Sequence, residues 1–117
     1  MWVTHENGVL VIAPRGPITD KNPDGQKELR RLAREVERSD EARELLVLTD
    51  LSDVTFMNST GLGELVMAYV HTVRRGGRFA LCSVPSRIKT LLEVTKLNLI
   101  LEQYKNRAEA RRAFGVR

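Results

Sequence analysis

The pattern of hydrophobic residues along the chain predicts strands that alternate with helices. Residues 9–13 form a short, β-branched apolar run bounded by turn formers, which is typical of a strand. Asn7-Gly8 just before it is a strong signal for a tight turn, so we expect residues 2–5 to pair with this strand as a hairpin. Residues 45–48 are apolar at every position, which indicates a central strand covered on both faces.

The first predicted helix runs from Pro23 to about Ser39. Asn22 followed by Pro23 fits a helix N-cap and the first helical position. Apolar residues then recur at spacings of three and four, so the helix has one apolar stripe that can cover a sheet. The residues of this stripe are Leu29, Leu32, Ala33 and Val36.

The rest of the chain continues the alternation of helices and strands. A second helix is expected to begin near Ser59 or Thr60 and to end at Gly76-Gly77. A loop at residues 49–58 is expected before this helix. After it, the expected elements are a strand at 78–84, a helix from 85, a strand at 97–101 and a helix at 106–114.

Together these elements predict an α/β fold with the order ββαβαβαβα. Repeated βα units favour a mixed, mostly parallel sheet of four to five strands covered by about four helices, with the first hairpin as an antiparallel edge. The 117 residues suffice for one domain with a hydrophobic core, and no repeat or linker divides them. We therefore expect a single domain over residues 1–117.

Composition narrows the classes of function. No apolar run approaches the length of a membrane span, and the N-terminal residues lack the features of a signal peptide, so a cytoplasmic protein is expected. Cys82 is the only cysteine and fits a small core residue, and no metal-ligand spacing joins His5 to His71. Neither a metal nor a cofactor is expected.

The charge balance raises the question of nucleic acid. Lys and Arg number 19 against 15 Asp and Glu, which gives a net charge of +4 and a pI near 9.6. In residues 28–38, however, the charges of the two signs are interleaved, as on a solvated helix face, and only residues 107–117 are mainly basic. We expect no direct nucleic-acid or membrane partner; strong salt dependence of a DNA complex would mark the nucleic-acid alternative.

The segment from residue 48 to residue 63 is the strongest candidate for function, because it joins a buried strand to a helix. The simpler interpretation is that Ser59 or Thr60 caps the helix through its hydroxyl. The second interpretation is that Ser59 accepts a phosphate, which would add about −1.5 to −2 charges at a helix end that favours anions. A partner docked there would then lose affinity, which makes a reversible switch.

An enzymatic role has little support in the same segment. Gly61-Leu62-Gly63 lacks the third glycine of a dinucleotide motif, and no phosphate-loop lysine follows it. Asp50, Ser52, Asp53 and Ser59 offer acids and hydroxyls, but no evident base or set of oxyanion donors accompanies them. We predict a binding protein, not an enzyme.

Several motifs together resemble the STAS domain family. They are residues 50–52 (Asp-Leu-Ser), 55–63 (Thr-Phe-Met-Asn-Ser-Thr-Gly-Leu-Gly), 76–78 (Gly-Gly-Arg) and 84–92 (Val-Pro-Ser-Arg-Ile-Lys-Thr-Leu-Leu). The resemblance is greatest to the stand-alone anti-sigma factor antagonists, whose hallmark is Asp-Ser-Ser/Thr-Gly-Leu-Gly at the start of the second helix. It extends over nearly the whole chain, and the family fold is similar to the order of elements predicted above.

The resemblance implies a partner-switching mechanism. An anti-sigma factor with serine kinase activity binds the unphosphorylated antagonist, releases its sigma factor and then phosphorylates the serine, and a PP2C-type phosphatase resets the cycle. Ser59 would be the phosphoacceptor. The implied docking residues are Asp50, Ser52, Phe56, Met57, Asn58, Ser59, Thr60, Gly61, Gly63, Glu64 and Met67, with His71 at the far end of the surface.

Two departures from the family pattern leave alternatives open. Asn58 stands where most switchable members have Asp, and residues 16–19 (Gly-Pro-Ile-Thr) replace a Gly-x-hydrophobic-Asp turn, with Asp20 following. Both put recognition by a kinase in doubt. The rival hypothesis is a STAS scaffold subunit of a stressosome-like particle or a lipid transport complex, which needs no modification; a weak homodimer is a further option.

Overall fold

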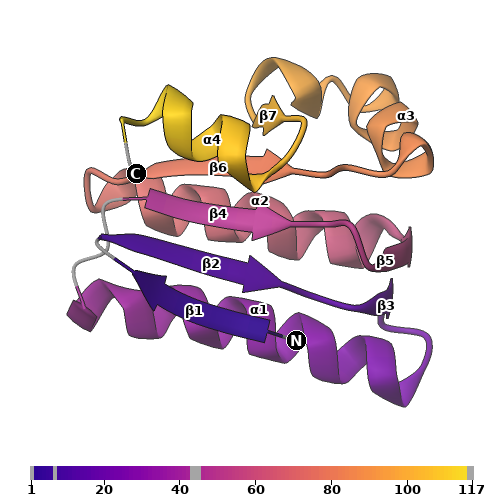
Figure 1. Ribbon diagram of the computed structural model, residues 1–117. Helices are drawn as coiled ribbons and strands as arrows, with labels where there is room; N and C mark the ends of the chain where they lie inside the picture. The colour runs from indigo at the N-terminus through magenta and orange to yellow at the C-terminus, as the bar shows by residue number, and fades with distance from the viewer. Residues whose placement is uncertain (1, 7, 43–45, 116–117) are drawn as a thin grey trace.

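The computed structural model describes residues 2–6, 8–42 and 46–115, which form one mixed five-stranded sheet with helices on both faces (Figure 1). The strand order is β1-β2-β4-β6-β7, in which β1 pairs antiparallel with β2 and the other neighbours are parallel. This confirms the predicted fold class. The strands are β1 (Trp2–Glu6), β2 (Val9–Ala13), β4 (Leu46–Asp50), β6 (Arg78–Cys82) and β7 (Glu102–Tyr104).

The N-terminal hairpin and the central strand are confirmed. Trp2 pairs with Ala13 at the open end of the hairpin, while Asn7 of the predicted turn lies outside the described residues. Strand β4 is buried at every position and lies between β2 and β6, as expected of a strand covered on both faces. Leu45 of the predicted run is also outside the described residues.

Helices cover the two faces unequally. Figure 1 shows α1 (Pro23–Ala42) and α2 (Ser59–Arg74) behind the sheet and α4 (Arg107–Ala113) in front of it, with α3 (Ser86–Val94) beyond one end. Successive side chains of a strand point to opposite faces. In β2, therefore, Leu10 and Ile12 join the core under α1 and α2, and Val9 and Val11 join the core under α4.

A second, two-stranded sheet was missed by the sequence pattern. The expected loop at 49–58 contains β5 (Val54–Met57), which pairs in parallel with β3 (Gly16–Ile18). The prediction of an uninterrupted loop was wrong because Val54 and Met57 are buried while the two residues between them are exposed, a pattern too short to indicate a strand. Pro17 in β3 also argued against a strand, although an edge position tolerates it.

The predicted strand at 97–101 was also wrong. Leu97–Leu99 form a short 3₁₀ helix, η1, after Lys96 in the left-handed conformation, and the strand follows as β7. A left-handed residue interrupts an extended backbone. Within the apolar run, Leu101 is buried whereas Leu99 is 78% exposed, so this run has no continuous buried face.

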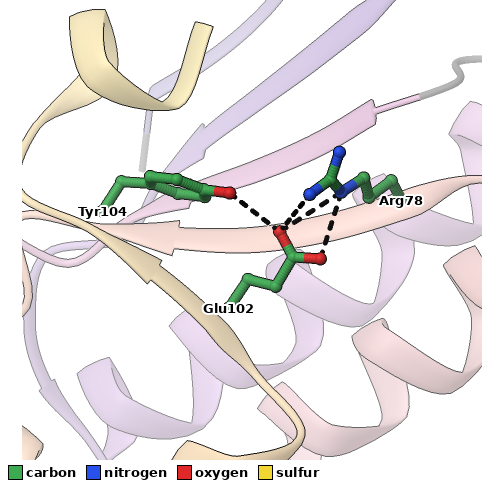
Figure 2. A network of polar contacts seen from close by, with 3 residues as sticks. All are labelled: Arg78, Glu102 and Tyr104. Atoms are coloured by element: carbon green, nitrogen blue, oxygen red, sulfur yellow. Dashed lines mark hydrogen bonds and ion pairs between the residues drawn. The ribbon is translucent and has the colours of Figure 1, made fainter. Parts of the chain in front are cut away.

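A polar network on β6 and β7 anchors the C-terminal helix. Figure 2 shows Arg78 and Tyr104 both directed at Glu102, with an Arg78 Nη2 to Glu102 Oε2 distance of 2.9 Å and a Tyr104 hydroxyl to Oε2 distance of 3.0 Å. The ring of Phe114, at the end of α4, lies 4.0 Å under the Arg78 guanidinium and makes an edge contact with Tyr104. These contacts hold α4 on the sheet.

The single cysteine is a core residue. Cys82 is buried under α4, and burial, with a smaller effect of the Asp50 charge, raises the pKa of its thiol to about 11. The thiolate is therefore scarce near neutral pH. Among the described residues, no three His, Cys, Asp or Glu side chains are grouped as metal ligands, and no helix is long and apolar enough to cross a membrane.

Candidate functional site

Strand β5 leads directly into α2, and Asn58 between them is the helix N-cap. Its backbone is extended, and its Oδ1 accepts a hydrogen bond from the Gly61 amide at 3.0 Å. The interpretation of Ser59 or Thr60 as the N-cap was wrong, because Asn caps a helix as well as Ser does and it comes one residue earlier. Ser59 and Thr60 are both exposed in the first turn of α2.

The side-chain amide nitrogen of Asn58 contacts Asp20. Asn58 Nδ2 donates to Asp20 Oδ1 at 2.7 Å, across 38 residues of sequence. This hydrogen bond is the largest cause holding the pKa of Asp20 below its usual range, and the Thr60 side chain adds a smaller effect in the same direction. Asp20, left open in the sequence, thus supplies a carboxylate beside the Asn58-Ser59-Thr60 turn.

Gly61 lets the first turn of α2 approach β3. A Cβ at this position would collide with the carbonyl oxygen of Ile18 and would lie 2.8 Å from Cγ of Met57. Gly61 and Met57 are both buried. Both residues therefore position the turn that presents Ser59, and they contribute little to an exposed docking surface.

Asp50 is likewise buried, at 6% exposure, at the end of β4. Its carboxylate accepts hydrogen bonds from the Ser52 amide at 2.9 Å and from Arg107 Nε at 2.6 Å. Burial would raise the pKa of Asp50, but the hydrogen bonds from Ser52 and Arg107 outweigh it and hold the pKa below its usual range. The structure thus gives Asp50 a role in holding α4 and the start of the loop.

The remaining predicted docking residues are accessible. Phe56 and Met67 are each 45% exposed, which is unusual for large apolar side chains and gives the surface two apolar contact points. A groove of about 270 Å³ begins at Phe56 and continues along Leu91 and Val94 of α3, with Arg87 beside it; the sequence prediction did not include this side. Also exposed or half-buried are Ser52, Asn58, Ser59, Thr60, Gly63, Glu64 and His71.

Exchanging Asn58 for Asp tests the contact with Asp20. Asn58→Asp keeps a capping oxygen but replaces the amide donor with a carboxylate next to Asp20, so one of the two pKa values must rise. A carboxyl pKa raised by folding costs stability above that pKa. We expect Asn58→Asp to lower the free energy of unfolding at neutral pH. This loss should disappear as the pH falls below about 4. Urea unfolding at several pH values measures this.

The control for this exchange is Asn58→Ser, which caps the helix without adding charge. Its stability difference from the parent should vary with pH less than that of Asn58→Asp, because it loses the amide that lowers the pKa of Asp20 but adds no second carboxylate. A pH-independent loss in Asn58→Asp would show that the two side chains do not interact as described.

Arg107→Gln tests the ion pair between Arg107 and the buried Asp50 carboxylate. Without the guanidinium, burial is opposed by the Ser52 hydrogen bonds alone, so the pKa of Asp50 rises from its present low value and part of the stability that it contributes above about pH 4 is lost. Because the Arg107 side chain is 45% exposed, solvent screening limits the expected loss at neutral pH to about 1–2 kcal/mol. Urea unfolding should show that this loss shrinks as the solution is acidified. The control Arg112→Gln, on the same helix, should change the free energy of unfolding by close to zero.

Comparison with known proteins gives one family and several relatives. The model of the STAS domain matches residues 2–110. An "Anti-sigma F factor antagonist" of Paenibacillus polymyxa is 28% identical over 106 residues, which cover 91% of this chain and 86% of that protein. These matches extend over nearly all of the chain.

Solved structures of similar proteins share the fold. An anti-sigma-factor antagonist (STAS) domain protein from Planctomyces limnophilus has a TM-score of 0.78 at 27% identity, with 97% of each chain covered. The Bacillus protein SpoIIAA in its phosphorylated form has a TM-score of 0.73 at 11% identity, with 96% of this chain and 97% of that chain covered. Its unphosphorylated form gives the same TM-score at 12% identity and 98% coverage of both chains.

Proposed function

Because the chain belongs to the STAS domain family, we propose that it is an anti-sigma factor antagonist gated by phosphorylation of Ser59. In its unmodified form it binds an anti-sigma factor that has serine kinase activity, and this binding releases a sigma factor. Phosphorylation of Ser59 ends the interaction, and a PP2C-type phosphatase restores it. The protein acts in the cytoplasm by binding and catalyses no reaction.

The observation that carries this proposal is the position of Ser59. Its hydroxyl is exposed in the first turn of α2, while Asn58 has already taken the capping role. The Ser59 side chain is therefore not needed to hold the helix. A phosphate there would lie at the positive end of the helix dipole, so the fold can accept it.

The surroundings of Ser59 support loss of binding after modification. Phe56, three residues before Ser59, and Met67, on the same helix as Ser59, are both exposed, which offers a partner docked on this turn apolar contacts. A phosphate adds about −1.5 to −2 charges, which must be desolvated beneath such a partner. Asp20, which Asn58 holds close to the same turn, adds negative charge to the modified surface.

Similarity to named proteins supports the same proposal. The Paenibacillus polymyxa relative is named an anti-sigma F factor antagonist, and the fold is shared with SpoIIAA, which is known in a phosphorylated and an unphosphorylated form. Asn58 differs from the family's usual Asp, but it supplies the same capping oxygen. The carboxylate beside this turn is provided by Asp20.

Incubation with magnesium-ATP and the serine kinases of the anti-sigma type from the same genome tests the proposal. Intact-mass measurement and peptide mapping should find a single phosphate on Ser59, and Ser59→Ala should abolish it. A stable complex without any phosphate would favour the rival scaffold role. The proposal would be overturned if the experiment gave neither a complex nor a phosphate.

A further inference from the structure

The exposed side of α1 carries a stripe of four cations. Lys27, Arg30, Arg31 and Arg34 stand at positions i, i+3, i+4 and i+7, which places them on one side of the helix. A hollow of about 300 Å³ is lined by these four residues. We call this set the cationic stripe; it lies on α1, not on the loop that presents Ser59.

Three of these cations make no ion pair with any residue that the structure describes. Within the part of the chain that the structure describes, Lys27, Arg30 and Arg34 make neither an ion pair nor a side-chain hydrogen bond. Two arginines on other elements, by contrast, are paired: Arg78 contacts Glu102 at 2.9 Å, and Arg107 contacts Asp50 at 2.6 Å. Lys27, Arg30 and Arg34 thus stand together, without ion pairs, within two turns of α1.

The fold does not require this arrangement. The side of α1 that packs on the core consists of Leu29, Leu32 and Val36, and the four cations lie outside it. Like charges three or four residues apart repel each other and weaken a helix. A negatively charged partner on the cationic stripe would remove this repulsion.

We propose that the cationic stripe docks an acidic segment of a partner protein, in which carboxylates repeat at the same helical spacing. Seven residues at a rise of 1.5 Å per residue span about 10 Å, the length of two helical turns. A carboxylate on each turn of the partner would face a cation of α1. This inference concerns a surface other than the Ser59 turn and does not depend on phosphorylation.

Two other classes of polyanion fit the surface less well. A helix that binds a membrane presents an apolar face beside its basic one, but the apolar face of α1 is buried in the core. A nucleic-acid backbone continues past the stripe on both sides. On the side toward α2, Arg30 and Arg34 also line a hollow with Glu37 and Glu64, and these carboxylates would repel the phosphates of a nucleic acid that continues there.

Binding of a glutamate-rich helical peptide, with carboxylates at i, i+3, i+4 and i+7, tests the inference. Calorimetry should give saturable binding that weakens with added salt, and NMR amide shifts should map to α1. Arg30→Glu with Arg34→Glu should weaken binding by about tenfold or more, because two attractions become repulsions. Circular dichroism of this variant reports whether α1 remains folded.

The matched control is Lys89→Glu with Lys105→Glu, which changes the net charge equally at two exposed lysines outside α1. This control and Ser59→Asp should both bind the peptide within about twofold of the parent protein. Absence of saturable binding, or an equal loss in both double variants, would overturn the proposal. So would tighter binding of a short DNA duplex or of phosphatidylserine vesicles at the same salt concentration.

Discussion

Replacing Ser59 with aspartate is expected to weaken the complex with the anti-sigma partner by about tenfold to a hundredfold, because a charge then lies beneath the docked protein. Ser59 is exposed, and Phe56, three residues before it, is 45% exposed and offers a partner an apolar contact. Calorimetry or surface plasmon resonance with the purified partner measures the change. Most of the effect should appear in the dissociation rate.

Ser59→Ala is the matched variant. It removes the phosphoacceptor but no contact that holds α2, because Asn58 provides the cap. We expect parent-like affinity from Ser59→Ala, no loss of binding in the presence of magnesium-ATP, and an unfolding midpoint close to that of the parent. Equal affinities of the alanine and aspartate variants would refute the gate.

Gly61→Ala should cause the largest loss of stability among the single exchanges considered. The new methyl group collides with the backbone carbonyl of Ile18, and backbone cannot move aside as a flexible side chain can. We expect the free energy of unfolding to fall by about 3 kcal/mol, at the upper end of the usual cost of overpacking. Chemical unfolding followed by circular dichroism measures it.

Gly63→Ala provides the comparison on the same helix. A Cβ at Gly63 meets no atom within 4 Å, and alanine favours a helix over glycine. This variant should be more stable than the parent by about 0.5–1 kcal/mol. If both exchanges destabilised the protein equally, the close approach of α2 to β3 would not be the cause.

The hydrophobic pattern predicted the large elements because each of them buries several regularly spaced residues. Leu46 to Leu48 and the stripe Leu29, Leu32 and Val36 are of this kind, and the structure places all of them in the core. Strands β3 and β5 were not predictable in this way, because β3 has three residues with a proline among them and β5 buries only its two ends. Such short strands are defined by their pairing with each other.

The candidate site shows the same limit. A run of three polar residues, Asn58-Ser59-Thr60, signals a helix start, but any of the three can cap, and the sequence alone does not choose among them. The contacts of Asn58 with Asp20 and of Asp50 with Arg107 join residues 38 and 57 positions apart. No local pattern encodes such pairs, so they became visible only in the folded chain.

The two-stranded sheet of β3 and β5 also has a consequence for motion. It is separate from the five-stranded sheet, and a pair of strands alone is only marginally stable in water. Its amide protons should therefore exchange with solvent through local openings. The amide protons of β4 should exchange more slowly, because they need rarer and larger openings. We therefore expect the turn that carries Ser59 to open locally more often than the central strand of the core.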